Sequence, residues 1–148
     1  MGRLIPEDFP LSALANDAER RVVEAFRDGL TDGWLILPDV GLTGNRDYQL
    51  DLVLLHEDWG IVDVEVKGHR VQVRDGAWFQ AGSRINPQPL SQARSNAYAL
   101  RGRLRAQVAG LEHVDVEYAV ALPNTTEITG QLPPDVQAPQ VLTAPLLD

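Results

Sequence analysis

The sequence has no cysteine, so disulfide bonds and thiolate metal sites are excluded. No apolar run approaches the roughly 20 residues of a membrane-spanning helix, and the N-terminal segment MGRLIPEDFP lacks the apolar core of a signal peptide. The chain also lacks glycine-rich nucleotide-binding loops, a serine or cysteine nucleophile elbow and an HxxxH zinc motif. The lack of cysteine, of a signal peptide and of a membrane-spanning run predicts a cytoplasmic protein with no membrane partner.

The composition is that of a folded protein, with 148 residues, 44% hydrophobic and 23% charged. The net charge of -8 argues against a nucleic-acid partner. However, residues 67–105 hold eight basic residues and one acidic residue, whereas the rest holds five arginines and twenty acids. A basic block of this kind is typical of a phosphate-binding surface. Alternatively, opposite charges interleave in three dimensions and cancel.

Apolar periodicity predicts two helices and a series of strands. The expected elements are a helix over 12–29 capped by Ser12, strands over 34–37, 48–55 and 61–67, a hairpin over 69–80, a helix over 90–109 and a strand over 114–122. Residues 38–47 are expected to form a loop. This order predicts an α/β fold with a mixed central sheet flanked by helices.

The C-terminal part differs in composition from the rest. From Pro123 to Asp148 the sequence is rich in proline and has no basic residue. We therefore predict a domain over 1–122 and an extended segment over 123–148, which is expected to link to a further domain.

The stretch IVDVEVKGHR carries ionisable residues on a strand that otherwise reads as central. Val62, Val64 and Val66 alternate with Asp63, Glu65 and Lys67, so valines line one face and charges the other. If the turn HEDWG places Leu55 opposite Ile61, then Asp51 lies opposite Glu65 on the same face.

Two opposed carboxylates repel unless a cation lies between them or one is protonated. Oxygen ligands at this spacing suit Mg²⁺ or Mn²⁺, and a nearby lysine can orient water or stabilise charge on a phosphate. The alternative is an exposed strand with a salt bridge from Lys67. Asp63 is either an extra acidic ligand or, as expected, a rim residue that is solvated or pairs with an arginine. Gln49 is expected to support Asp51.

The stretches AERRVVEAF (18–26), YQLDLVLLHEDWGIVDVEVKG (48–68) and NPQPLSQARSNAYALRGRL (86–104) together resemble the nuclease-related domain (NERD) family of the PD-(D/E)xK nuclease superfamily. Leu50 stands where the named motif has proline. The resemblance implies a restriction-endonuclease-like αβββαβ core and a metal-dependent nuclease. The DNA-processing activity would be phosphodiester hydrolysis.

The resemblance also implies roles for individual residues. Asp51, Glu65 and the Val66 backbone carbonyl would bind Mg²⁺ or Mn²⁺, and Lys67 would position the attacking water. Glu19 matches the family's helical glutamate, and Gln92 matches the glutamine of the second helix. Gln92 shares a helical stripe with Asn96 and Arg103, which predicts a phosphate-facing row, with an ordinary polar face as the alternative. Together with Arg70 and Arg94, Asn96 and Arg103 are the expected nucleic-acid-binding residues.

Two functions remain open from the sequence. The first is a metal-dependent nuclease, with DNA as the expected substrate. The second is a catalytically silent nuclease-fold module that binds nucleic acid or a partner protein. The resemblance further implies a helicase or kinase-like domain C-terminal to this one in a longer protein, and a homodimer.

Overall fold

The computed structural model describes residues 1–14, 16–43, 46–74, 76–80, 82–86, 88–125 and 141–143, with the backbone alone at Arg74. The two α-helices are α1 (Asp17–Gly29) and α2 (Pro89–Gln107), preceded by a short 3-10 helix (Leu11–Ala13). The strands are β1 (Arg3–Leu4), β2 (Trp34–Leu42), β3 (Tyr48–His56), β4 (Gly60–Val66), β5 (Val71–Arg74), β6 (Ala77–Gln80), β7 (Ser83–Arg84), β8 (Val116–Leu122) and β9 (Val141–Thr143).

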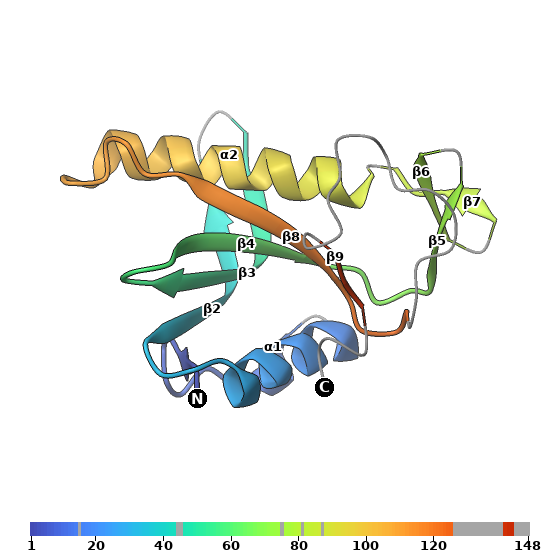
Figure 1. The fold of residues 1–148 in the computed structure, drawn as a ribbon, viewed down its shortest axis with the longest axis horizontal. Coiled ribbons are helices and arrows are strands. Elements are labelled where there is room, and N and C mark those ends of the chain that lie inside the picture. The colour runs from blue at the N-terminus through green and yellow to red at the C-terminus, as the bar shows by residue number, and fades with distance from the viewer. Residues whose placement is uncertain are drawn as a thin grey trace.

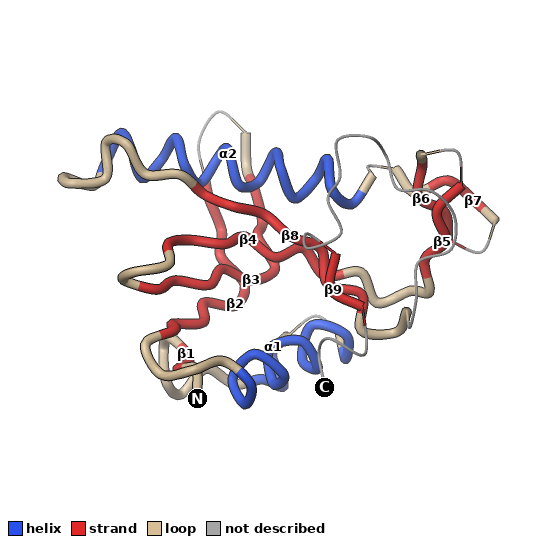
Figure 2. The backbone as a smooth tube through the Cα atoms, viewed as in Figure 1, coloured by secondary structure: helices blue, strands red, loops and turns tan. Residues whose placement is uncertain are grey.

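The strands form two sheets. The main sheet has six strands in the order β1-β2-β3-β4-β8-β9, and the small sheet has the order β5-β6-β7. In the main sheet β3 is antiparallel to β2 and β4, whereas the pairs β1–β2, β4–β8 and β8–β9 are parallel. Figure 2 shows the small sheet set apart from the main one, beyond the N-terminal end of α2. The predicted mixed sheet is confirmed, but the predicted hairpin lies outside it.

The helices cover opposite faces of the main sheet (Figure 1). On one face, α1 packs Val22 and Val23 against a cluster that includes Leu52 and Val64. On the other face, α2 packs Ala97 and Leu100 against a cluster that includes Val53. The valine face of β4 therefore points to α1, and its charged face points to α2. Of the helices in the described ranges, none is long and apolar enough to cross a membrane.

The predicted register between β3 and β4 is confirmed. Leu55 lies opposite Ile61 and Leu52 opposite Val64. Continuing this register by one residue places Asp51 opposite Glu65. The apolar alternation of β4 fixes the register, because a slip of β4 by one residue would turn Asp63 and Glu65 toward α1 in place of the valines.

Two local predictions are wrong. Helix α1 begins at Asp17, because the Asn16 side chain accepts a hydrogen bond of 2.9 Å from Glu19 N and caps the helix in place of Ser12. Strand β2 continues through Pro38 to Leu42 instead of ending in a loop. Proline is tolerated there because β1 pairs with β2 at Leu35 and Ile36, and among the described residues no strand pairs with that edge at Pro38.

Strand β9 was not predicted from the sequence. It comprises Val141–Thr143 and pairs with β8 in parallel, with Val141 buried in the core. Residues 126–140 and 144–148 of the predicted extended segment lie outside the described residues. The proposed division at residue 122 therefore stays a prediction.

Candidate active site

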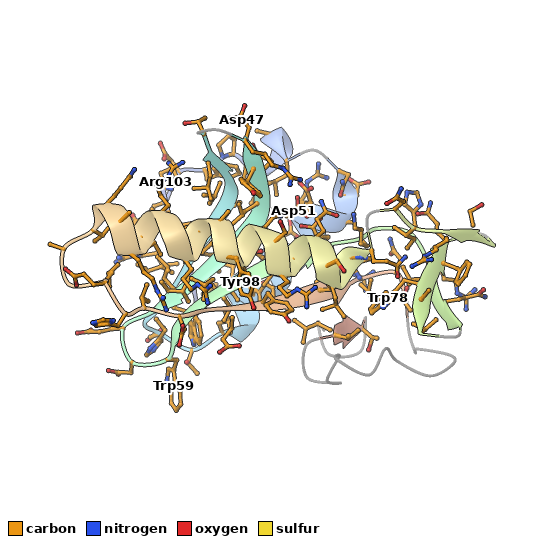
Figure 3. All side chains as sticks on the ribbon, turned by 90° about the horizontal axis from the view of Figure 1, so that it is seen from above. Asp47, Asp51, Trp59, Trp78, Tyr98 and Arg103 are labelled. Atoms are coloured by element: carbon orange, nitrogen blue, oxygen red, sulfur yellow. The ribbon has the colours of Figure 1, made fainter. Side chains whose placement is uncertain are left out.

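Four elements bring the predicted catalytic residues to one end of the main sheet. Asp51 lies on β3, Glu65 on β4 and Lys67 directly after β4. Gln92 projects from α2, and Glu19 from α1. Figure 3 shows Asp51 beside the N-terminal half of α2, in the region from which Gln92 comes.

Asp51 is fixed by the backbone of β4. Its Oδ2 accepts a hydrogen bond of 2.9 Å from Val66 N. In a strand, the N–H and C=O groups of one residue point toward the same neighbouring strand. The Val66 carbonyl therefore faces β3, the side on which Asp51 lies, as a third metal ligand would require.

Lys67, the only lysine in the sequence, is held between two elements. Its Nζ lies 3.6 Å from Glu65 Oε1 and donates a hydrogen bond of 3.1 Å to Gln92 Oε1. Its backbone N–H donates to Ala121 O on β8 at 3.0 Å. Gln92 thus orients the ammonium group, a role consistent with its predicted place in the site.

A close approach between Gly68 and α1 places Glu19 at the site. A Cβ atom at Gly68 would lie 2.7 Å from Ala18 Cβ, so only glycine lets the chain pass this close to the helix. Asn124 Nδ2 donates to Gly68 O at 2.6 Å and reinforces the same corner. Glu19 follows Ala18 directly, which places its side chain next to the Asp51 carboxyl.

Burial changes the ionisation of the acidic groups. Glu65 is 3% exposed, and burial raises the pKa of its carboxyl to about 8, with the Asp51 charge adding to the rise. Burial also raises the pKa of Asp51, against the opposing effects of the Val66 N–H bond and the Lys67 charge. Within the described part of the chain, Glu65 Oε2 has no hydrogen-bond partner. The pair is therefore short of positive charge and of donors.

The expectation of a solvated Asp63 at the sheet rim is wrong. Its exposure is 0%, and neither carboxyl oxygen finds a hydrogen-bond partner among the described residues. The side chain lies between Val53 on β3 and Tyr118 on β8, on the face that α2 covers. Burial raises the pKa of Asp63 to about 8, and the Asp51 charge adds to the rise.

The predicted nucleic-acid-binding residues are not gathered in one place. Arg70 and Arg94 are exposed. Asn96 is 6% exposed, one turn along α2 from Gln92. Arg103 donates to Thr43 O and ties α2 to the end of β2. Figure 3 shows Arg103 toward the C-terminal end of α2, whereas Asp51 lies beside the N-terminal half. Its role in binding nucleic acid stays a prediction.

Sequence reasoning overlooked Asp39 on β2. The pairs Pro38–Leu52 and Val40–Leu50 flank it, so Asp39 falls opposite Asp51 in the register. Its φ of 57° is left-handed, and its carboxyl accepts a hydrogen bond from Gln49. Gln49, expected to support Asp51, therefore binds a different carboxylate. No sequence signal marked Asp39, because the surrounding residues read as a loop.

A protein-family model for the nuclease-related domain matches residues 14–123. The chain belongs to the NERD family. No curated protein and no solved structure matches it. The matched range contains α1, β2–β8 and α2, including every element of the site. The NERD assignment and the mixed sheet between two helices agree with the predicted restriction-endonuclease-like fold.

The residues of this NERD domain fit a divalent cation that keeps part of its water shell. In the described residues, no group of three His, Asp or Glu side chains forms a complete metal site. Mg²⁺ commonly takes one or two carboxylates and completes its octahedron with waters and substrate oxygens. Asp51, Glu65 with its unpartnered oxygen, and the Val66 carbonyl supply such a partial set.

Proposed function

We propose that this NERD domain is a metal-dependent nuclease that hydrolyses phosphodiester bonds, with DNA as its substrate. The observation that carries the proposal is the acidic pair of half-buried Asp51 and buried Glu65 beside a single, well-held lysine. Buried carboxylates of this kind are costly unless a cation compensates them. A divalent cation between these carboxylates would also neutralise negative charge on a substrate phosphate.

Asp51, Glu65 and the Val66 carbonyl would hold Mg²⁺ or Mn²⁺, which when bound supplies positive charge to the phosphate and an activated water. The Lys67 ammonium, oriented by Gln92 and Glu65, would position the attacking water and stabilise negative charge as it develops. Glu19 would orient Asp51 from the helix side. A cytoplasmic location, a homodimer and a further C-terminal domain stay predictions.

The direct test is cleavage of labelled single-stranded and duplex DNA with Mg²⁺ or Mn²⁺. Replacing Lys67 by Met removes a preorganised charge next to the phosphate, so we expect cleavage to fall by about 10²–10³-fold. Glu65→Gln removes a metal ligand, and we expect a loss at least as large.

The matched control is Glu117→Gln, an exposed carboxylate on the neighbouring strand β8, which should keep full activity. Wild-type protein that binds DNA but never cleaves it would favour the silent binding module. Equal activity in wild type and Glu65→Gln would contradict the assigned site.

A further inference from the structure

A cleft of about 360 Å³ opens beside the acidic pair, between the start of β3 and the first half of α2. Its lining includes Gln92, whose Oε1 accepts the hydrogen bond from Lys67 Nζ at 3.1 Å. It also includes Gln49, which precedes Asp51 by two residues on β3 and so shares its face. The cleft therefore adjoins the contact between Gln92 and Lys67, and we expect a substrate bound at the proposed metal site to extend into it.

A buried amide with an unused donor lines this cleft. Asn96 is 6% exposed, and its Nδ2 has no hydrogen-bond partner within the described ranges. Buried side-chain donors are nearly always paired in folded proteins. An acceptor atom of a ligand in the cleft would satisfy Asn96. Ser95 contributes a hydroxyl to the same lining.

The opposite wall of the cleft offers a flat surface. Tyr48 lines it, with the Arg46 guanidinium 5.1 Å from the ring centroid. Tyrosine rings and guanidinium planes are the surfaces on which unpaired nucleobases stack. Asp47 also belongs to the lining, so its negative charge offsets that of Arg46. This balance suits a neutral base better than a second phosphate.

The volume limits what can enter. Pockets for small ligands start at about 300 Å³, so this cleft holds one base with its sugar and no duplex. We propose that the cleft receives the unpaired nucleotide next to the scissile phosphate, stacked on the Arg46 guanidinium that lies over the Tyr48 ring and hydrogen-bonded to Asn96 Nδ2. The substrate class would then be single-stranded nucleic acid, or duplex ends with an unpaired nucleotide. This inference rests on the proposed nuclease function.

The test compares binding of a labelled single-stranded DNA oligonucleotide and its duplex, by fluorescence anisotropy with Ca²⁺ in place of Mg²⁺. Wild type should bind the single strand more tightly. Asn96→Leu removes the donor at similar size, and we expect about a tenfold loss for the single strand with duplex affinity unchanged. Its melting temperature should not fall, since an unpartnered buried donor is replaced by an apolar group.

Gln107→Leu, an exposed change near the end of the same helix, is the matched control and should bind as wild type. If Asn96→Leu does not fold, Tyr48→Leu replaces it, with the same expected loss for the single strand. Unchanged single-strand affinity, or equal losses on both substrates, would overturn the cleft proposal. Single-strand binding that depends on Asn96, without cleavage in Mg²⁺ or Mn²⁺, would support the cleft and overturn the nuclease.

Discussion

At the scale of single residues, β4 carries carboxyl groups whose protonation depends on burial. Asp63 and Glu65 both have a pKa of about 8, and the pKa of Asp51 is also raised. Between about pH 4 and pH 8 the folded protein therefore keeps protons on these carboxyl groups, whereas the same groups in the unfolded chain have lost them. Stability of the metal-free protein should fall as the pH rises through this window, and level off above it.

Replacing Asp63 by Asn tests this linkage. Near pH 5 both side chains are neutral, so we expect little change in the free energy of unfolding. Above pH 8 the variant should be more stable by about 1–3 kcal/mol, because no unpartnered carboxylate is buried. Urea unfolding across this pH range measures both effects.

Asp58→Asn, an exposed change in the turn before β4, is the control and should keep the wild-type pH dependence. An Asp63→Asn variant with that same dependence would show that Asp63 does not carry the buried proton.

At the scale of elements, the junction between Gly68 and α1 couples the helix to the site. A Gly68→Ala substitution would bring two Cβ atoms to 2.7 Å, so α1 must shift and carry Glu19 with it. We expect a loss of about 1–3 kcal/mol in the free energy of unfolding, together with reduced cleavage activity. Thermal unfolding and the cleavage assay measure the two effects.

Gly102→Ala provides the opposite case within α2. A Cβ atom at Gly102 meets nothing within 4 Å, so this variant should gain about 0.5–1 kcal/mol from helix propensity.

Adding Ala18→Gly to Gly68→Ala should restore activity by removing the clash. If Gly68→Ala is as active and stable as wild type, α1 does not position Glu19 through this contact.

The same scale shows what the sequence could predict. The register of β3 and β4 followed from the turn HEDWG and from apolar alternation, which are local signals. The burial of Asp63 did not follow, because it depends on α2 (Pro89–Gln107), a distant segment of the chain, packing across the strand. The predicted strand over 34–37 ends too early, because proline within a strand normally indicates its end. The pairing of β1, which shows that this edge tolerates proline, is visible only in the structure.

At the scale of the whole molecule, the net charge of -8 argues against a nucleic-acid substrate, but the charge is unevenly distributed along the chain. The basic block of residues 67–105 begins at Lys67 and runs through α2, the helix that lines both the site and the cleft. Part of that block is structural, because Arg105 pairs with Asp115 at 2.9 Å and Arg103 binds a backbone carbonyl. Arg70 and Arg94 are exposed, and their contact with phosphates stays a prediction.

The proposed binding of a divalent cation by Asp51 and Glu65 together is tested most directly by titration calorimetry with Mn²⁺. We expect saturable binding to wild type, with proton release near pH 7 because metal displaces the proton held by the acidic pair. Binding should vanish in Asp51→Ala with Glu65→Ala and persist in the control Asp58→Ala with Glu117→Ala. Absence of binding to wild type, or binding that survives the loss of both carboxylates, would contradict the claim.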